Sequence, residues 1–242
     1  MEHIFTQDML KGLSYIAIYF VICASAALTC RLLIKIPNEL FRKILHFILL
    51  GSLIVFVYGF SQWKTAAAAA VIFAAVVWPI LFVCEGIRGF SELTTERKHG
   101  ELKKSLLLVF SMFALIITVC WGWLGDRMLV LVCVYAWGFG DAAAALVGKK
   151  WGKHKVHWKR VHDTKSWEGS AAMFLCSLIC VTVLLGIRGG LHPAGYVVIP
   201  AVTALVSAFI ELITLDGMDT VNCPLAAMSV VLPLVELFEK VG

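Results

Sequence analysis

Apolar residues form long runs along this chain of 242 residues. A run of roughly 20 apolar residues is enough to cross about 30 Å of hydrocarbon as a helix. Two runs are weak, because 40–58 begins with Arg42 and Lys43 and 223–238 is interrupted by Pro233. The pattern predicts an all-α polytopic integral membrane protein with about eight transmembrane helices, or seven as the alternative. The six clear runs lie near residues 13–34, 65–84, 105–124, 128–147, 170–187 and 196–215.

The composition agrees with a membrane protein. Hydrophobic residues make up 60% of the chain and its mean hydropathy is +0.88, which is too apolar for a soluble domain. The first run has no clear small-residue cleavage site and more runs follow it, so we expect it to be retained and not removed as a signal peptide. The 8 cysteines form no C-x-x-C pair, which argues against a disulfide framework or a zinc site. We expect residues 1–242 to form one membrane-embedded domain.

The basic residues predict an orientation. Most of the 21 lysines and arginines fall on alternate loops, and cationic loops resist translocation. We therefore expect the loops at about 85–104, 148–169 and 216–222 to lie in the cytoplasm and to form the active site, with both termini on the opposite side. The formal net charge of +5 then sits on one membrane face, where it favours contact with membrane lipids and phosphates and not with nucleic acid.

Acidic residues gather at these same ends of the apolar runs. One such acid alone would be typical of a solvated helix end. Several acids that converge with two lysine-rich loops favour a divalent metal held against phosphates, since Mg²⁺ takes carboxylate and phosphate oxygens. A transporter would instead place ionisable residues near the bilayer midplane. The acids are Glu85, Asp141, Glu211, Asp216 and Asp219.

The run that contains Asp141 ends in a loop rich in glycine and lysine. Gly148 and Gly152 have the spacing of a helix-packing motif. The lysines and tryptophan between them argue against burial between helices. We expect the backbone amides there to approach a phosphate, with Lys155 adding positive charge.

The next span begins with the stretch Thr164-Lys165-Ser166-Trp167-Glu168-Gly169-Ser170. Two interpretations are open. Ser166 and Glu168 can be helix-capping residues, or Lys165 and the helix N-terminus can hold a phosphate. The histidines before this stretch have no cysteine or carboxylate ligand set beside them, so we expect a solvated loop and not a metal cluster. They are His154, His157 and His162.

These motifs resemble those of the CTP-dependent lipid-alcohol kinases, a family that includes dolichol, phytol and farnesol kinases and the fungal CTP-dependent diacylglycerol kinase. The resemblance runs from about residue 39 to 225, in the family's order. Thr164 departs from it, since the signature has a lysine there, and the family's Asp-Asn pair reads Asp219-Thr220, with Asn222 two places on. The matching pieces are Asp141-x-x-Ala144-x-x-x-Gly148-x-x-x-Gly152, Lys165-Ser166-x-Glu168-Gly169-Ser170, Glu39-x-x-Arg42-Lys43-x-x-His46, Gly100 with Lys103-Lys104-Ser105, and Glu211 with Asp219 and Pro224.

The resemblance implies transfer of the γ-phosphoryl group of CTP to a lipid alcohol in the bilayer, with Mg²⁺ as cofactor. We expect Asp141 and Asp219, with Glu211 behind them, to hold Mg²⁺ against the triphosphate. Either Asp141 or Glu168 is expected to be the general base. The expected phosphate contacts are Lys165, Ser166, Lys155, Lys103, Lys104 and the backbone around Gly148 and Gly152. Arg42, Lys43 and His46 are expected to contact the acceptor headgroup or the nucleotide.

The acceptor alcohol and the reaction class stay open in the sequence. Phytol, farnesol, another polyprenol and diacylglycerol are the candidate acceptors, and the short chain favours these over dolichol. The phosphatidate cytidylyltransferases share a similar motif layout and use CTP, so such an enzyme is the alternative. A lipid transporter without enzymatic activity is a further alternative. The oligomeric state is not indicated by any motif.

Overall fold

A computed structural model describes residues 2–86, 90, 100–157, 161, 165–214 and 217–240. In this described part, eight helices are long and apolar enough to cross a membrane, and there is no strand beyond one isolated β-bridge. The protein is therefore an integral membrane protein of the all-α class. Eight spans are present and not seven, because both weak runs form complete helices. Thr164, His162, Asp216 and parts of the three predicted loops lie outside the described residues.

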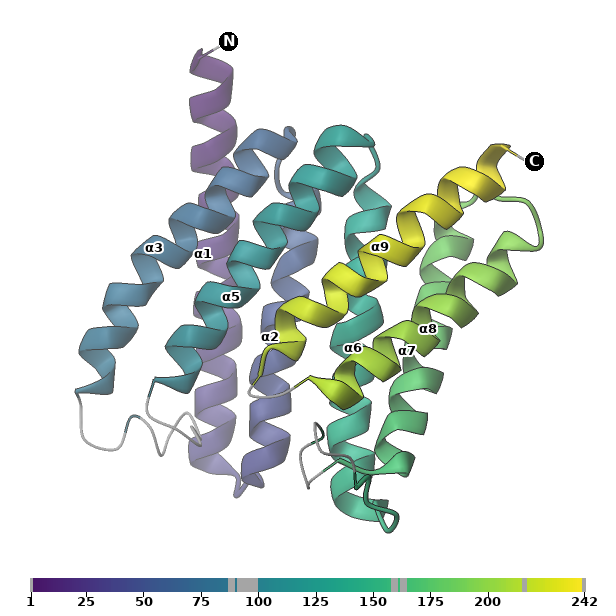
Figure 1. The fold of residues 1–242 in the computed structure, drawn as a ribbon. Helices are drawn as coiled ribbons and strands as arrows, with labels where there is room; N and C mark the ends of the chain where they lie inside the picture. Colours follow the sequence, from purple (N-terminus) through teal and green to yellow (C-terminus); the bar gives the residue numbers. More distant parts are fainter. Residues whose placement is uncertain are drawn as a thin grey trace. The chain divides into compact units, whose positions relative to one another are not determined.

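The chain divides into two compact units, Met1–Gly125 and Asp126–Gly242. The first unit contains four helices and a π-helical segment, and the end of α1, the start of α2, the end of α3 and the start of α5 lie at the same end of this unit (Figure 1). Buried phenylalanines, among them Phe56, Phe110 and Phe113, pack edge-to-face or tilted in its core. The elements are α1 (Glu2–Leu33), α2 (Asn38–Tyr58), α3 (Trp63–Glu85), α5 (Glu101–Ile116) and η1 (Ile117–Trp123), of which α5 and η1 form one span.

A buried aspartate fixes the start of α3 in this unit. Asp8 is 8% exposed, and its carboxylate accepts hydrogen bonds from the backbone N–H groups of Ser61 and Gln62 and from the Thr65 hydroxyl. These bonds tie the two residues before α3, and a side chain of its first turn, to α1. The carboxylate within the first span thus has a structural role.

The second unit consists of α6 (Arg127–Trp151), α7 (Trp167–Arg188), α8 (Gly195–Ile213) and α9 (Asp219–Lys240). Its central helix is α6, which packs against the other three. In α6, 67% of the apolar window is buried, against at most 44% in any other described span. Pro233 lies inside α9 without ending it, as membrane helices permit.

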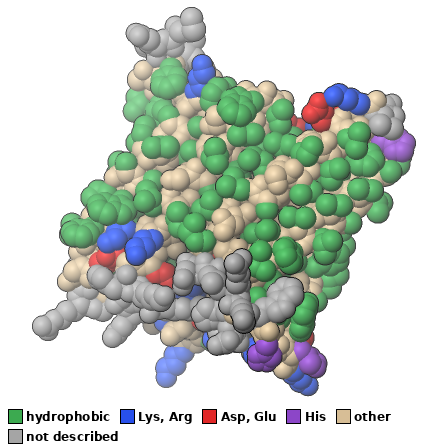
Figure 2. Space-filling view, in the orientation of Figure 1, with side chains coloured by type: hydrophobic (Ala, Val, Ile, Leu, Met, Phe, Trp, Pro, Cys, Tyr) green, Lys and Arg blue, Asp and Glu red, His purple; other side chains and the backbone are tan. Residues whose placement is uncertain are grey.

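The outer surface of the helices is apolar. The face drawn in Figure 2 is mainly hydrophobic along the helices, with the charged side chains toward helix ends. Examples in the second unit are Ile179 on α7 and Leu205 on α8, which are both 63% exposed. Such surfaces fit a hydrocarbon solvent, in which apolar side chains carry no cost of exposure.

Three charged residues join helix ends at the end of the second unit where α6 begins. The Asp126 carboxylate accepts hydrogen bonds from the N–H groups of Met128 and Leu129 and therefore caps α6. Arg188, at the end of α7, donates to Asp126 at 2.6 Å and forms an ion pair with Glu239. This network links three helices by their ends.

We predict that Asp126→Ala destabilises the protein, because the start of α6 loses its cap and Arg188 loses a buried partner. The expected cost is about 1–3 kcal/mol. Thermal unfolding in detergent, followed by circular dichroism, would measure it. Glu236→Ala is the matched control, since Glu236 pairs with Lys240 on the surface and both side chains are about two-thirds exposed. Equal shifts for the two variants would contradict the assigned role of Asp126.

Candidate functional site

The described part of the α6–α7 connection forms a short antiparallel hairpin. Lys155 and Ser166 form a β-bridge, the Val156 N–H donates to the Lys165 carbonyl at 3.2 Å, and the Trp167 N–H donates to the His154 carbonyl at 3.0 Å. The loop that follows Gly152 therefore returns on itself. The pairing places Lys155 and Lys165 on neighbouring backbone segments.

Two valines attach this hairpin to α8. Val156 and Val161 are the only aliphatic residues between Gly152 and Lys165. They form a buried cluster with Leu212, each of the three at most 8% exposed. Burial of apolar side chains is the main favourable term in packing. The cluster holds the hairpin next to Glu211, the residue before Leu212.

Glu168 binds the first backbone segment of the hairpin through hydrogen bonds. Its carboxylate accepts hydrogen bonds from the backbone N–H groups of Lys153 at 3.2 Å and His154 at 3.1 Å. Its Oε1 also lies 2.6 Å from the His154 Nδ1 atom, although the His154 side chain is 78% exposed. A carboxylate that accepts several backbone N–H bonds holds those amides in place. Glu168 thus positions the loop in this structure.

Gly148 and Gly152 lie where α6 and α7 approach each other, and both are half-buried. A Cβ atom on Gly152 would lie 2.6 Å from the Ser166 hydroxyl oxygen and 2.2 Å from the Gly148 carbonyl oxygen. A Cβ atom on Gly148 would lie 3.7 Å from the Gly169 Cα atom of α7. The lysines between the glycines are exposed, so they point away from the contact while the glycines face it. The i,i+4 spacing puts both glycines on one helix face.

Ser166 is the N-cap of α7, in agreement with the capping interpretation. It is 3% exposed, and its hydroxyl accepts a hydrogen bond from the Gly169 N–H at 3.1 Å. The Gly152 N–H donates to the Gly148 carbonyl, and the next two amides donate to Glu168. The described amides from Gly152 to His154 thus already have acceptors within the protein.

The central contact of the second unit joins the hairpin to α8. The Lys165 ammonium forms an ion pair with the Glu211 carboxylate and donates to the Glu211 carbonyl at 2.7 Å. The side chains are 21% and 7% exposed, so both charges are largely removed from solvent. A buried charge is stable only when it is paired and hydrogen-bonded. The pair links residues that are 46 positions apart in the chain.

Two further acids surround this ion pair. Glu211 interacts electrostatically with Asp141 of α6 and Asp219 of α9, and the buried Cys223 lies within range of all four charged groups. The structure thus brings together Asp141, Lys165, Glu211 and Asp219. Among the described residues, no three His, Cys, Asp or Glu side chains lie close enough to hold a metal ion by themselves.

The remaining predicted site residues belong to the first unit. Arg42 forms ion pairs with Glu39 at 3.4 Å and with Glu101 of α5 at 3.2 Å, and so joins α2 to α5. Lys43 and His46 are half-buried on α2.

Two lysines at the start of α5 differ in their surroundings. Lys103 forms an ion pair with Glu85 at 2.8 Å and lies over the rings of Trp78 and Phe82. The side chain of Lys103 is 14% exposed, whereas Lys104 is exposed. The two adjacent lysines therefore have different environments, which their sequence pattern does not distinguish.

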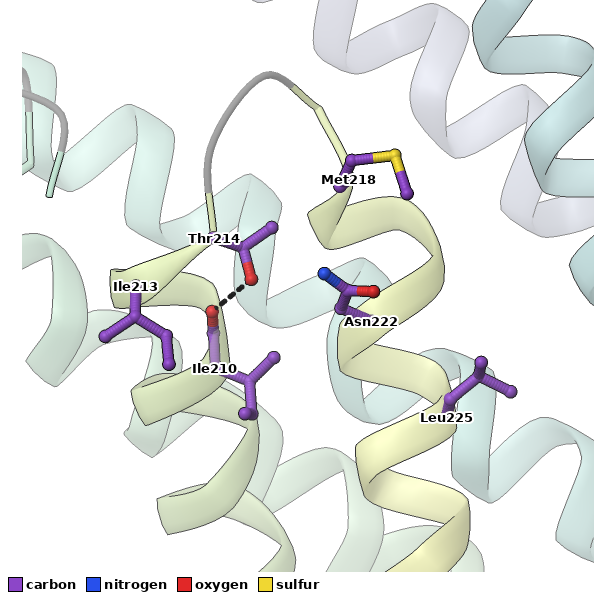
Figure 3. A pocket seen from close by; sticks show the side chains of 6 residues that line it. All are labelled: Ile210, Ile213, Thr214, Met218, Asn222 and Leu225. Carbon is purple, nitrogen blue, oxygen red and sulfur yellow. Dashed lines mark hydrogen bonds between the residues drawn. The ribbon is translucent and has the colours of Figure 1, made fainter. Parts of the chain in front are cut away.

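A pocket of about 500 Å³ opens between the end of α8 and the start of α9. Figure 3 shows Thr214 and Asn222 on opposite sides of this space. The Thr214 hydroxyl donates to the Ile210 carbonyl at 2.6 Å. The side chain of Asn222 is exposed, and the structure gives it no hydrogen bond within the described part of the chain. The lining residues are Ile210, Ile213, Thr214, Met218, Asn222 and Leu225.

Sequence reasoning missed three groups in this region: the valine cluster, the pairing of His154 with Glu168, and the pocket. The valines carried a detectable signal, because they are isolated aliphatic residues in a charged loop. His154 was expected in a solvated loop; it is exposed, as is His157, but Glu168 binds it. No local pattern indicated the pocket, since its two sides come from different helices.

Comparison with known proteins finds relatives along most of the chain. The chain is 30% identical over 209 residues to the phytol kinase of Synechocystis sp., covering 84% of each protein. It is 28% identical over 234 residues to a probable chloroplastic phytol kinase of Triticum aestivum, covering 88% of this chain and 72% of the relative. It is 28% identical over 232 residues to probable phytol kinase 1 of Oryza sativa subsp. japonica, covering 87% of this chain and 68% of the relative. No family model and no solved structure matches the chain.

We predict that Gly152→Ala displaces the hairpin, because the added methyl group would overlap backbone and the Ser166 side chain. Limited proteolysis in detergent should cut the 152–166 connection at least several-fold faster than in the unchanged protein. Gly186→Ala is the matched control, since nothing lies within 4 Å of its Cβ position on α7. That control should be stable or slightly stabilised, because alanine is the better helix former. Equal cleavage rates in the two variants would contradict the close contact.

Proposed function

The chain belongs to the phytol kinase family and is therefore a lipid-alcohol kinase, and we propose that it transfers the γ-phosphoryl group of CTP to phytol or a related isoprenoid alcohol. Farnesol, other polyprenols and diacylglycerol are further candidate acceptors. The observation that carries the proposal is the gathering of Asp141, Lys165 and Asp219 around Glu211 in the second unit. Phosphoryl transfer needs alignment and charge neutralisation more than covalent help, and such a cluster can provide both.

The carboxylates suit Mg²⁺ as the cofactor. Mg²⁺ is usually bound by one or two carboxylates, with water and phosphate oxygens completing its coordination. We propose that Asp141 and Asp219 hold the ion, because Glu211 is committed to Lys165. In this proposal Glu211 does not bind the ion directly but holds the Lys165 side chain in place. When bound, the ion would neutralise charge on the phosphate oxygens.

Lysines are the proposed phosphate contacts. Lys165 is paired with Glu211 of the acidic group, and Lys155 is exposed on the neighbouring hairpin segment. The amides around Gly152 are already engaged, which favours lysine side chains over backbone amides in this role. Gly148 and Gly152 then contribute by letting the hairpin approach α7, and Ser166 by capping that helix.

We assign the general base to Asp141 and not to Glu168. In the proposed step the alcohol oxygen forms a bond to the γ-phosphorus, the bond from that phosphorus to the β–γ bridging oxygen breaks, and CDP leaves. The alcohol proton passes to the Asp141 carboxylate. Glu168 is less suited to this role, because both of its oxygens accept hydrogen bonds from the hairpin.

We further propose that the site faces the cytoplasm. If all eight helices cross the membrane, the α1–α2, α3–α5, α6–α7 and α8–α9 connections fall on one side and both termini on the other. The cation-rich loops are among these connections, and cationic loops stay cytoplasmic. In the first unit, Arg42, Lys43, His46, Lys103 and Lys104 are further proposed contacts for anionic headgroups or nucleotide phosphates, and of these Lys104 is exposed.

Labelled CTP separates the kinase from a phosphatidate cytidylyltransferase, because the two enzymes attack different phosphorus atoms. The purified protein would be incubated with Mg²⁺, a panel of lipid alcohols or phosphatidate, and CTP labelled at the α or γ position. We expect γ label in the lipid and release of CDP. Transfer of α label with release of pyrophosphate would overturn the proposal in favour of the cytidylyltransferase. Testing the other nucleoside triphosphates in parallel would establish the donor. Absence of turnover with every combination would contradict the kinase proposal and favour a binding or transport protein.

Asp141→Asn and Glu168→Gln should differ in their effects on turnover. We expect Asp141→Asn to lower kcat by roughly 10²-fold or more, since a charge at the reacting centre is lost. Glu168→Gln should retain more activity and the pH profile of the unchanged protein, because its role is to position the loop. Asp126→Asn is the control on the same helix as Asp141: asparagine also caps helices well, so activity should be unchanged. A larger loss for Glu168→Gln than for Asp141→Asn would reverse the assignment of the base.

A further inference from the structure

The pocket between α8 and α9 has the chemistry of a binding site for one end of an amphiphile. Four of its six lining residues are aliphatic or methionine, and the two polar ones are Thr214 and Asn222. Ligand pockets are typically of about 300–1,000 Å³, mostly apolar, with a few polar groups that fix orientation. The pocket fits this description.

Its depth suits a lipid alcohol. Thr214 directly follows the last residue of α8, whereas Leu225 lies six residues into α9, about 9 Å deeper at 1.5 Å per residue. The polar lining residues therefore lie near the two helix ends, and the apolar lining continues along α9 to Leu225. A lipid alcohol in a bilayer has the same arrangement, with its hydroxyl at the surface and its chain below.

The polar lining residues lie beside the acidic cluster. Thr214 is three residues after Glu211, and Asn222 is three residues after Asp219. Residues three apart on a helix are neighbours on its surface. Glu211 and Thr214 are neighbours at the end of α8. Asp219 and Asn222 are neighbours in the first turn of α9. The pocket thus opens on helix faces adjacent to those that carry the carboxylates.

The two polar groups have different hydrogen-bonding capacities. The Thr214 hydroxyl uses its proton in the bond to Ile210, so it has only acceptor capacity left. The Asn222 amide is exposed and can donate to an alcohol oxygen. Such a bond to the oxygen would leave the proton of the alcohol available for transfer. An amide near the hydrocarbon is costly unless it has a partner.

We infer that this pocket is the acceptor site: it holds the hydroxyl-bearing end of the lipid alcohol, with Asn222 donating to the hydroxyl oxygen and Ile210 and Leu225 contacting the first carbons of the chain. This inference rests on the proposed kinase function. It adds a place for the acceptor, which none of the motifs in the sequence indicated.

Kinetics of three variants test the inference. Leu225→Trp fills the pocket and should raise KM for the alcohol about tenfold or more, with KM for CTP unchanged. Asn222→Leu should raise the KM for the alcohol several-fold, since the loss of one hydrogen bond of about 1 kcal/mol changes binding by about fivefold. Leu205→Trp is the matched control, because Leu205 is exposed on α8 and does not line the pocket; both constants should stay unchanged. A normal KM for the alcohol in Leu225→Trp, or equal rises in both constants, would overturn the inference.

Photolabelling gives a readout that does not depend on turnover. A diazirine-bearing phytol analogue would be irradiated with the nucleotide-free protein in lipid nanodiscs, and labelled peptides would be identified by mass spectrometry. We expect label on residues of the α8–α9 pocket, competition by excess phytol, and loss of that label in Leu225→Trp. Label that phytol does not displace would mean an ordinary bilayer contact and would overturn the inference.

The two measurements separate the pocket from the reaction. If the unchanged protein transfers phosphoryl groups but the displaceable label falls elsewhere, the kinase proposal stands and the acceptor site is wrong. If the pocket is labelled and competed but no nucleotide supports transfer, the acceptor site stands and the kinase proposal fails.

Discussion

The second unit depends on one buried ion pair, between Lys165 and Glu211. Glu211 is largely buried near the end of α8, and like charges on Asp141 and Asp219 act on it. Without a counter-charge, such a carboxylate would be strongly unfavourable in a medium of low dielectric constant. Lys165 supplies the counter-charge and also bonds the backbone carbonyl of the same residue. The ion pair therefore allows three carboxylates to lie close together.

The position of Lys165 is itself determined by a set of weaker contacts. The hairpin that carries it is closed by backbone bonds, attached to α8 by Val156 and Val161, and held by Glu168 on its other side. The contact of Gly152 with Ser166 brings the hairpin close to the helix N-terminus. A flexible lysine on a loop would lose much side-chain entropy on pairing. Here the backbone that carries Lys165 is already ordered by other contacts. Forming the ion pair therefore costs less conformational entropy than it would on a flexible loop.

A lipid kinase must bind both a phosphoryl donor and a lipid acceptor. The acidic cluster and the pocket, on neighbouring faces of the same helices, suit one substrate each. The acidic face suits a charged, water-soluble phosphoryl donor, and the pocket suits an apolar acceptor that stays in the membrane. Because α8 and α9 contribute to both, their ends can bring the two substrates together without a separate soluble domain. Substrates that are held in mutual alignment gain much of the rate enhancement that phosphoryl transfer needs.

The sequence by itself determined the class of the fold and the chemical character of the site. Membrane spans are readable because hydrocarbon requires long apolar runs and fully bonded backbones, and both requirements act on contiguous residues. Even the weak run with Pro233 became a full helix. The motif residues Asp141, Lys165, Glu211 and Asp219 were also identifiable, and they converge in the structure. The charge and hydrogen-bonding groups of each residue belong to its own side chain and do not depend on which residue it contacts.

Only the tertiary structure decided which residue each of these groups meets. The Lys165–Glu211 pair spans 46 positions, and the bond from the Lys153 amide to Glu168 spans 15, so neither follows from local periodicity. The glycines were expected near phosphate but pack at a helix contact, because small residues serve both purposes and only the neighbouring helix distinguishes them. The lining of the pocket likewise comes from two different helices. Pairing across a fold depends on packing between distant segments, and a linear pattern does not contain that information.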